Sequence, residues 1–68
     1  MNEDHLNIEI RKFLKKVGIS SQRFLENHIK ESVRSGSFKI GQSIELEMKL
    51  KIKESHKENL ISDKLIIE

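Results

Sequence analysis

The sequence predicts a small α+β domain in which two N-terminal helices form a helical hairpin and pack on one face of an antiparallel β-hairpin. Two observations predict this fold. Apolar residues recur at helical spacing through the first half of the chain, and they alternate strictly with charged residues after Gly41. At 68 residues without cysteine, the chain is expected to be one domain, residues 1–68, without disulfides or thiolate metal sites.

The first helix is expected over residues 3–17. Its apolar positions follow the spacing of an amphipathic helix; they are Leu6, Ile10, Phe13, Leu14 and Val17. Asn2 is suited to cap its N-terminus, since a short polar side chain accepts a hydrogen bond from the first turn. Gly18 is expected to end this helix in the left-handed conformation.

The second helix is expected over residues 21–35. Ser20 is suited to cap it, and Ile19 and Phe24 stand at the two positions of a hydrophobic staple. Gly36 is expected to close it. The most buried side chains of the domain are expected to come from both helices and the first strand; they are Phe13, Leu14, Leu25, Ile29, Met48 and Leu50.

Two strands are expected, over residues 43–53 and 60–67. In the first, five aliphatic side chains alternate with Glu and Lys, as in a strand with one buried and one solvated face. In the second, Asp63 falls on the apolar side, and a β-bulge at Ser62-Asp63 would turn it outward. Residues 38–40 are either a short extra strand or a connecting loop.

Charge favours a hairpin register with a two-residue turn at Ser55-His56. This register sets residues of opposite charge across from each other; the pairs are Glu54 with Lys57, Lys53 with Glu58, and Glu47 with Lys64. A register shifted by two residues sets Lys49 against Lys64, which repel.

No residues form a recognisable active site, so we expect no catalytic residue, no cofactor, no metal and no enzyme activity. The three histidines, His5, His28 and His56, are never three or four residues apart, so no local metal pair exists. His28 lies on the apolar side of its helix and is interpreted as a packed or boundary side chain, with a ligand or general base as the alternative. The serines have ordinary positions at helix ends and before a strand.

The charged residues suggest one candidate binding surface. The net charge is only +2, but basic and polar side chains cluster where the two expected helices meet; they are Arg11, Lys12, Lys15, Lys16, Gln22 and Arg23. Residues 10–34 have the spacing of a helix-turn-helix, which makes weak nucleic-acid binding an alternative function. Glu26 and Glu31 on the second helix oppose it, because they would repel phosphates.

The N-terminus, Met1 to Asp4, is acidic and has no apolar run like that of a secretory signal. No stretch is apolar enough to span a membrane. We therefore expect a cytoplasmic protein that does not bind membranes. A monomer is favoured over a weak homodimer formed through the edge of the hairpin, since an unpaired edge can template another chain.

The segment Ile10 to Arg23, IRKFLKKVGISSQR, resembles a family of short bacterial, mostly proteobacterial, proteins known only as a domain of unknown function. Those proteins also begin Met-Asn-Glu and end in an alternating pair of strands. From Phe24 onward this chain departs from their more charged, alanine-rich second helix. The resemblance implies a bacterial cytosolic protein with this architecture, and it brings no activity.

The sequence therefore does not determine a biochemical function. The leading hypothesis is a small, non-enzymatic binding or adaptor protein that acts through contacts with an unidentified protein partner. Nucleic-acid binding through residues 10–34 is the alternative.

Overall fold

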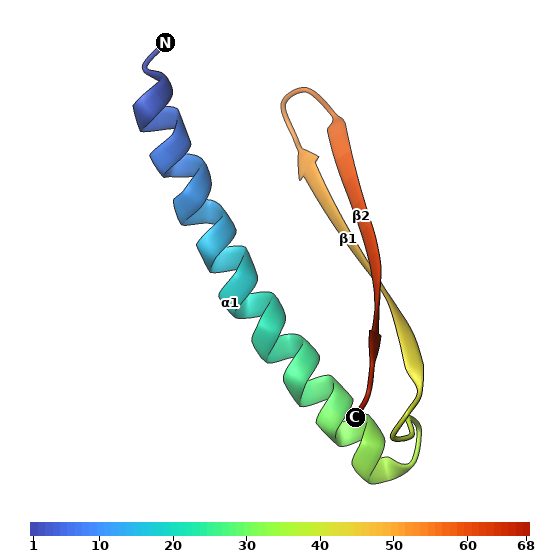
Figure 1. The fold of residues 1–68 in the computed structure, drawn as a ribbon. Helices are drawn as coiled ribbons and strands as arrows, with labels where there is room; N and C mark the ends of the chain where they lie inside the picture. The colour runs from blue at the N-terminus through green and yellow to red at the C-terminus, as the bar shows by residue number, and fades with distance from the viewer. The chain divides into compact units, whose positions relative to one another are not determined.

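The computed structural model describes residues 1–68 as one long helix followed by a two-stranded hairpin (Figure 1). The elements are α1 (Glu3–Ser35), β1 (Ser43–Ile52) and β2 (Lys57–Ile66). The chain divides into two compact units, Met1–Ser37 and Phe38–Glu68. The predicted β-hairpin is confirmed, whereas the predicted helical hairpin is wrong. The packing of helical residues on the sheet stays a prediction.

Both ends of α1 carry the caps that the sequence predicts. Asn2 is extended, and its side-chain oxygen accepts a hydrogen bond from the His5 backbone N–H at 3.0 Å. Gly36 adopts the left-handed conformation, with φ 85°, and its N–H donates to the Val33 carbonyl at 3.2 Å. These caps satisfy backbone groups that the helix leaves unpaired, which fixes where the helix begins and ends.

The helix does not break at Gly18. Positive φ angles among the glycines occur only at Gly36 and Gly41, and Ser20 lies inside α1 rather than at a cap. A glycine inside a helix lowers stability by only about 1 kcal/mol relative to alanine. A break would instead unpair several N–H and C=O groups on either side. The chain also has no proline to force one.

One continuous helix joins the two expected apolar stripes in phase. Val17, Ser21 and Leu25 succeed one another at intervals of four residues, so the apolar positions before and after Gly18 lie on the same side. The helix has 33 residues and a length of about 50 Å. We call the apolar side of the N-terminal half of α1 the apolar stripe; it consists of Leu6, Ile10, Phe13, Leu14 and Val17.

The expected core is only partly buried. Phe13 is 53% exposed, Leu14 is 48% exposed and Met48 is 40% exposed, so the prediction that they are buried is wrong. Leu25, Ile29 and Leu50 are half-buried. Ile67, which is 6% exposed, is the one buried hydrophobic side chain. The apolar residues that pattern alone assigned to a core are therefore largely accessible to solvent.

The hairpin has a different register from the one predicted. Ser43 pairs with Ile66 and Ile52 pairs with Lys57, which leaves a four-residue loop, residues 53–56, in place of the two-residue turn. A two-residue turn needs residues that tolerate positive φ, usually Gly or Asn. The longer loop places His56 alone at positive φ, 58°. Opposite charges still meet in this register, at Glu45–Lys64 and Lys51–Glu58.

The predicted β-bulge is also wrong, because the pairing runs without interruption and sets Asp63 directly opposite Leu46. Residues 38–40 are not a strand. They enter a turn in which the Gln42 side-chain oxygen accepts a hydrogen bond from the Lys39 N–H at 2.9 Å, with Gly41 at φ 91°. The sheet therefore has two strands, and each strand has one unpaired edge.

Replacing Gly18 with alanine tests the continuous helix. A Cβ at this position would meet no atom within 4 Å, so Gly18→Ala should raise the free energy of unfolding of the helix by about 0.5–1 kcal/mol. Urea melts followed by circular dichroism at the helical band measure it. Gly36→Ala is the control and should lower stability, because its φ of 85° is strained for alanine. A loss of stability in Gly18→Ala would show that the helix is broken there.

Candidate binding surface

The basic residues of the candidate surface gather along one side of α1. Lys12, Lys16, Ile19 and Arg23 follow one another at intervals of four, three and four residues, which places them in one row on a helix. Together with Lys15 and Ser20 they line an open hollow on the helix. By helical spacing this row lies on the side of α1 opposite the apolar stripe. We call Lys12, Lys15, Lys16 and Arg23 the basic row.

The basic row has few negative charges near it. Five cations and no carboxylate lie between Glu9 and Glu26; the cations are Arg11, Lys12, Lys15, Lys16 and Arg23. Lys12 is paired with Glu9 at 3.7 Å, and both side chains are mostly exposed. Such an exposed pair contributes at most about 1 kcal/mol. The other four cations form no ion pair, so they are available to an anionic ligand.

Two members of the candidate surface stand apart from the basic row. The Gln22 amide donates a hydrogen bond to the Glu26 carboxylate at 2.8 Å, and neither Gln22 nor Arg11 lines the hollow. The expected helix-turn-helix is absent, because residues 10–34 all lie within α1. No second helix is therefore held at an angle to enter a groove of DNA, as that motif requires.

The apolar stripe is the feature whose role sequence reasoning missed. Its side chains were assigned to a core, yet Leu6 is 42% exposed and Ile10 is 47% exposed, and Phe13 and Leu14 are exposed to a similar degree. Exposed large apolar residues that are contiguous on one side of a helix are typical of a binding surface. The spacing from Leu14 to Leu25 keeps helical phase through Gly18 and so signals one continuous helix, but no pattern in the sequence signals that the stripe is exposed.

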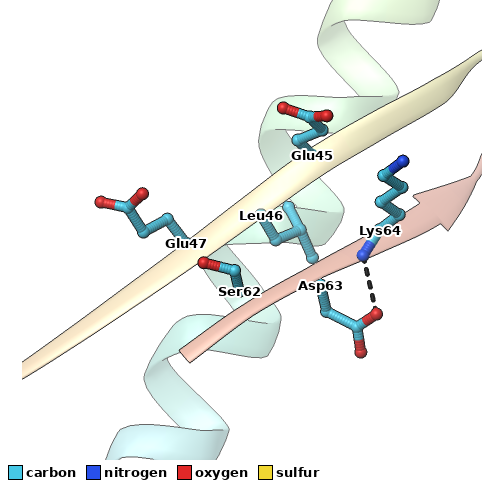
Figure 2. A pocket seen from close by; sticks show the side chains of 6 residues that line it. All are labelled: Glu45, Leu46, Glu47, Ser62, Asp63 and Lys64. Atoms are coloured by element: carbon cyan, nitrogen blue, oxygen red, sulfur yellow. Dashed lines mark hydrogen bonds between the residues drawn. The ribbon is translucent and has the colours of Figure 1, made fainter. Parts of the chain in front are cut away.

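A second hollow lies within the hairpin (Figure 2). It is lined by side chains of both strands; they are Glu45, Leu46, Glu47, Ser62, Asp63 and Lys64. The Asp63 carboxylate accepts a hydrogen bond from the Lys64 backbone N–H at 2.8 Å. No histidine lines the hollow to serve as a base for Ser62. Its two glutamates are exposed, so the arrangement is a solvated surface of mixed charge.

The three histidines lie on separate turns of α1 and in the hairpin loop. The His5 ring nitrogen is 4.0 Å from the Glu9 carboxylate on the first turns of α1. The His28 ring stacks on Phe24, with ring centroids 6.0 Å apart, and His56 is in the hairpin loop. No group of three or more His, Cys, Asp or Glu side chains is arranged to hold a metal ion.

The comparison with protein families gives one match. The model of the Family of unknown function (DUF6494) matches residues 1–68, the whole length of the chain. The chain belongs to this family. The expected membership in a family of unknown function is therefore confirmed. No curated protein and no solved structure matches the chain, and no helix of this family member has the length and apolarity needed to cross a membrane.

Asp63 provides a test of the hairpin register. It lies opposite Leu46, on the side of the sheet where every β1 residue is apolar, and aspartate is unfavourable in strands. We expect Asp63→Thr to raise the stability of the hairpin by about 0.5–1 kcal/mol. Amide hydrogen exchange of β1 and β2 measures the change. Ser62→Thr, on the other side of the same strand, is the matched control and should have a smaller effect. Faster exchange in Asp63→Thr would contradict this placement.

Proposed function

We propose that this chain is a non-enzymatic binding protein that acts through protein contacts, with the apolar stripe of α1 as its contact surface. The observation that supports the proposal is the exposure of large side chains in a row, above all Phe13 at 53% and Leu14 at 48%. An amphipathic helix that presents side chains at intervals of three and four residues is suited to a hydrophobic groove on a partner.

The energetics support such a role for the stripe. Burying one large apolar side chain contributes about 1.5–3 kcal/mol. The stripe carries four large side chains that are close to half exposed, at positions 6, 10, 13 and 14. A partner that covers them gains several kcal/mol before the entropy cost of association. The opposite side of the helix carries the basic row and can remain in water.

We also propose that the protein is bacterial and works in the cytoplasm. The support is the resemblance of the segment Ile10 to Arg23 to short proteobacterial proteins, together with a composition without cysteine that suits a reducing compartment. In this setting an adaptor would meet its partner in solution, without a membrane as a second ligand.

Site-specific photo-crosslinking in the native host tests the proposed contact. A photoreactive phenylalanine at Phe13 should yield a discrete crosslinked partner, because this side chain lies in the stripe. The same group at Lys16, on the opposite side of α1, is the matched control and should yield much less. Mass spectrometry then identifies the partner. Crosslinks from position 13 that lead only to this chain's own hairpin would contradict the proposal.

Nucleic-acid binding is the second candidate, and the basic row is the observation that favours it. Lys15, Lys16 and Arg23 are cations without an ion pair on one exposed surface. Since the helix-turn-helix is absent, contact would run along a single helix and would be directed at phosphates rather than bases. Contacts of this kind are independent of sequence and weaken steeply with salt.

Fluorescence anisotropy with labelled duplex and single-stranded oligonucleotides tests this candidate. At about 50 mM salt the wild type should bind, and the logarithm of its binding constant should fall linearly with the logarithm of the salt concentration. Replacing Lys15, Lys16 and Arg23 with alanine should abolish binding, whereas Lys39→Ala, outside the basic row, should not. The absence of binding by the wild type at this salt would eliminate the candidate.

A further inference from the structure

The outer edge of β1 has unpaired backbone groups. The sheet contains only β1 and β2, so every second residue of β1 directs its N–H and C=O away from β2. Open edges of this kind pair with another strand unless something blocks them. β1 is ten residues long and has neither proline nor a bulge to block pairing. The composition of the edge therefore decides which strand it accepts.

The charges of β1 are arranged symmetrically with opposite sign about Met48. Glu45 and Glu47 precede Met48, and Lys49 and Lys51 follow it at the same distances. If a second β1 runs antiparallel with its Met48 opposite this one, Glu45 faces Lys51 and Glu47 faces Lys49. Each of these pairs forms twice because of the two-fold symmetry. Cross-strand pairs of opposite charge stabilise a sheet.

On the other face of the two paired β1 strands, all side chains are aliphatic except the thioether of Met48. Ile44 faces Ile52, Leu46 faces Leu50, and the two Met48 side chains face each other on the symmetry axis. Since residues of equal parity are paired, the charged side chains of the two β1 strands lie on one face and their apolar side chains on the other. The register therefore satisfies charge and hydrophobicity at once.

Other ways of pairing two copies of the hairpin form fewer opposite-charge and apolar cross-strand pairs. A parallel, in-register pairing sets each charge against its own copy. Antiparallel registers shifted by two residues set Glu47 against Glu47 or Lys49 against Lys49, which repel. Pairing through β2 centred on Ile61 sets Lys57 against Leu65 and mixes polar with apolar side chains. The β1 edge, centred on Met48, is the self-complementary one.

We propose that two copies of this chain associate through β1, antiparallel about Met48, to form a four-stranded sheet of order β2-β1-β1-β2. The occupant of the edge is thus a second copy of the chain. A two-stranded hairpin alone is marginally stable in water, whereas three or more strands with an apolar face are stable. The two copies have equivalent surfaces in this contact, so the assembly closes as a dimer. This interface is distinct from the apolar stripe of α1.

Single-cysteine variants test the register directly, since the chain has no other cysteine. Met48→Cys places two thiols opposite each other on the symmetry axis, where Cα atoms are about 4.5–5.5 Å apart, a separation that a disulfide bridges. It should form a covalent dimer under mild oxidation. Ile44→Cys is the matched control, on the same face of the same strand. Its two copies would lie about 27 Å apart along the strands, and it should stay monomeric.

Two results would overturn the proposal. One is equal crosslinking by the two variants. The other is the absence of a Met48→Cys dimer while Val17→Cys crosslinks, which would place the contact on the helix. A crosslink at position 48 without one at position 44 supports the proposed register and leaves the proposed role of the apolar stripe to its own test.

Charge reversal provides a second test of the register. Glu47 lies opposite Ser62 within the hairpin, so Glu47→Lys creates directly opposed Lys–Lys pairs only in the dimer and should raise its dissociation constant about tenfold. Lys49→Glu should weaken association likewise; because it also removes the ion pair between Lys49 and Glu58 within the hairpin, 3.4 Å long, amide hydrogen exchange of the hairpin is measured alongside it. An equimolar mixture of both variants should recover association, because every pair is again Glu with Lys. The controls Glu54→Lys and Lys39→Glu make the same changes in net charge and should leave association unchanged. Failure of the mixture to associate, or equal weakening in the controls, would contradict the register.

Discussion

The scarcity of buried apolar surface is the constraint on which the rest of the structure depends. Ile67 alone among the hydrophobic side chains is buried, and fourteen large ones are exposed, from Met1 to Ile66. A chain of this size has a small core even when it is compact. α1 is about 50 Å long and each ten-residue strand is about 34 Å long, so the elements differ in the length of apolar surface they offer. Association with another chain is one way to bury these side chains.

The two units expose different surfaces, and this suggests a division of roles. The hairpin has a charge pattern in β1 that is complementary to itself, which suits a second copy. The helix has no such symmetry, because its cations concentrate in the basic row while its carboxylates lie at Glu3, Asp4 and Glu9 and again from Glu26 onward. A surface that is not self-complementary is better suited to a different partner. On this account the hairpin joins two copies and the helices bind the partner.

Local signals in the sequence predicted local structure well. The caps at Asn2 and Gly36, the strand from Ser43 to Ile52 and membership in a family of unknown function were predicted correctly, whereas the burial of Met48 and Ile52 was not. The break at Gly18 was predicted wrongly, because a glycine followed by Ser20 looks like a helix boundary. The helix continues because a break would unpair backbone groups on both sides of Gly18, a cost that cannot be read from any single residue.

The predicted hairpin register was wrong because charge pairs are nearly as good in the observed register, and turn geometry made the difference. The basic row was found from sequence, whereas the exposure of the apolar stripe depends on tertiary packing that periodicity cannot report.

The most direct test of this account is the dependence of unfolding on protein concentration. If the chain completes its core by association, the midpoint of thermal or urea unfolding should rise steadily from micromolar to millimolar protein, as mass action requires for a folded dimer. Sedimentation over the same range should then show conversion from the 8.0 kDa chain to a species of twice that mass. A midpoint that is independent of concentration, with a single monomeric species throughout, would show that the chain is stable alone and would contradict the account.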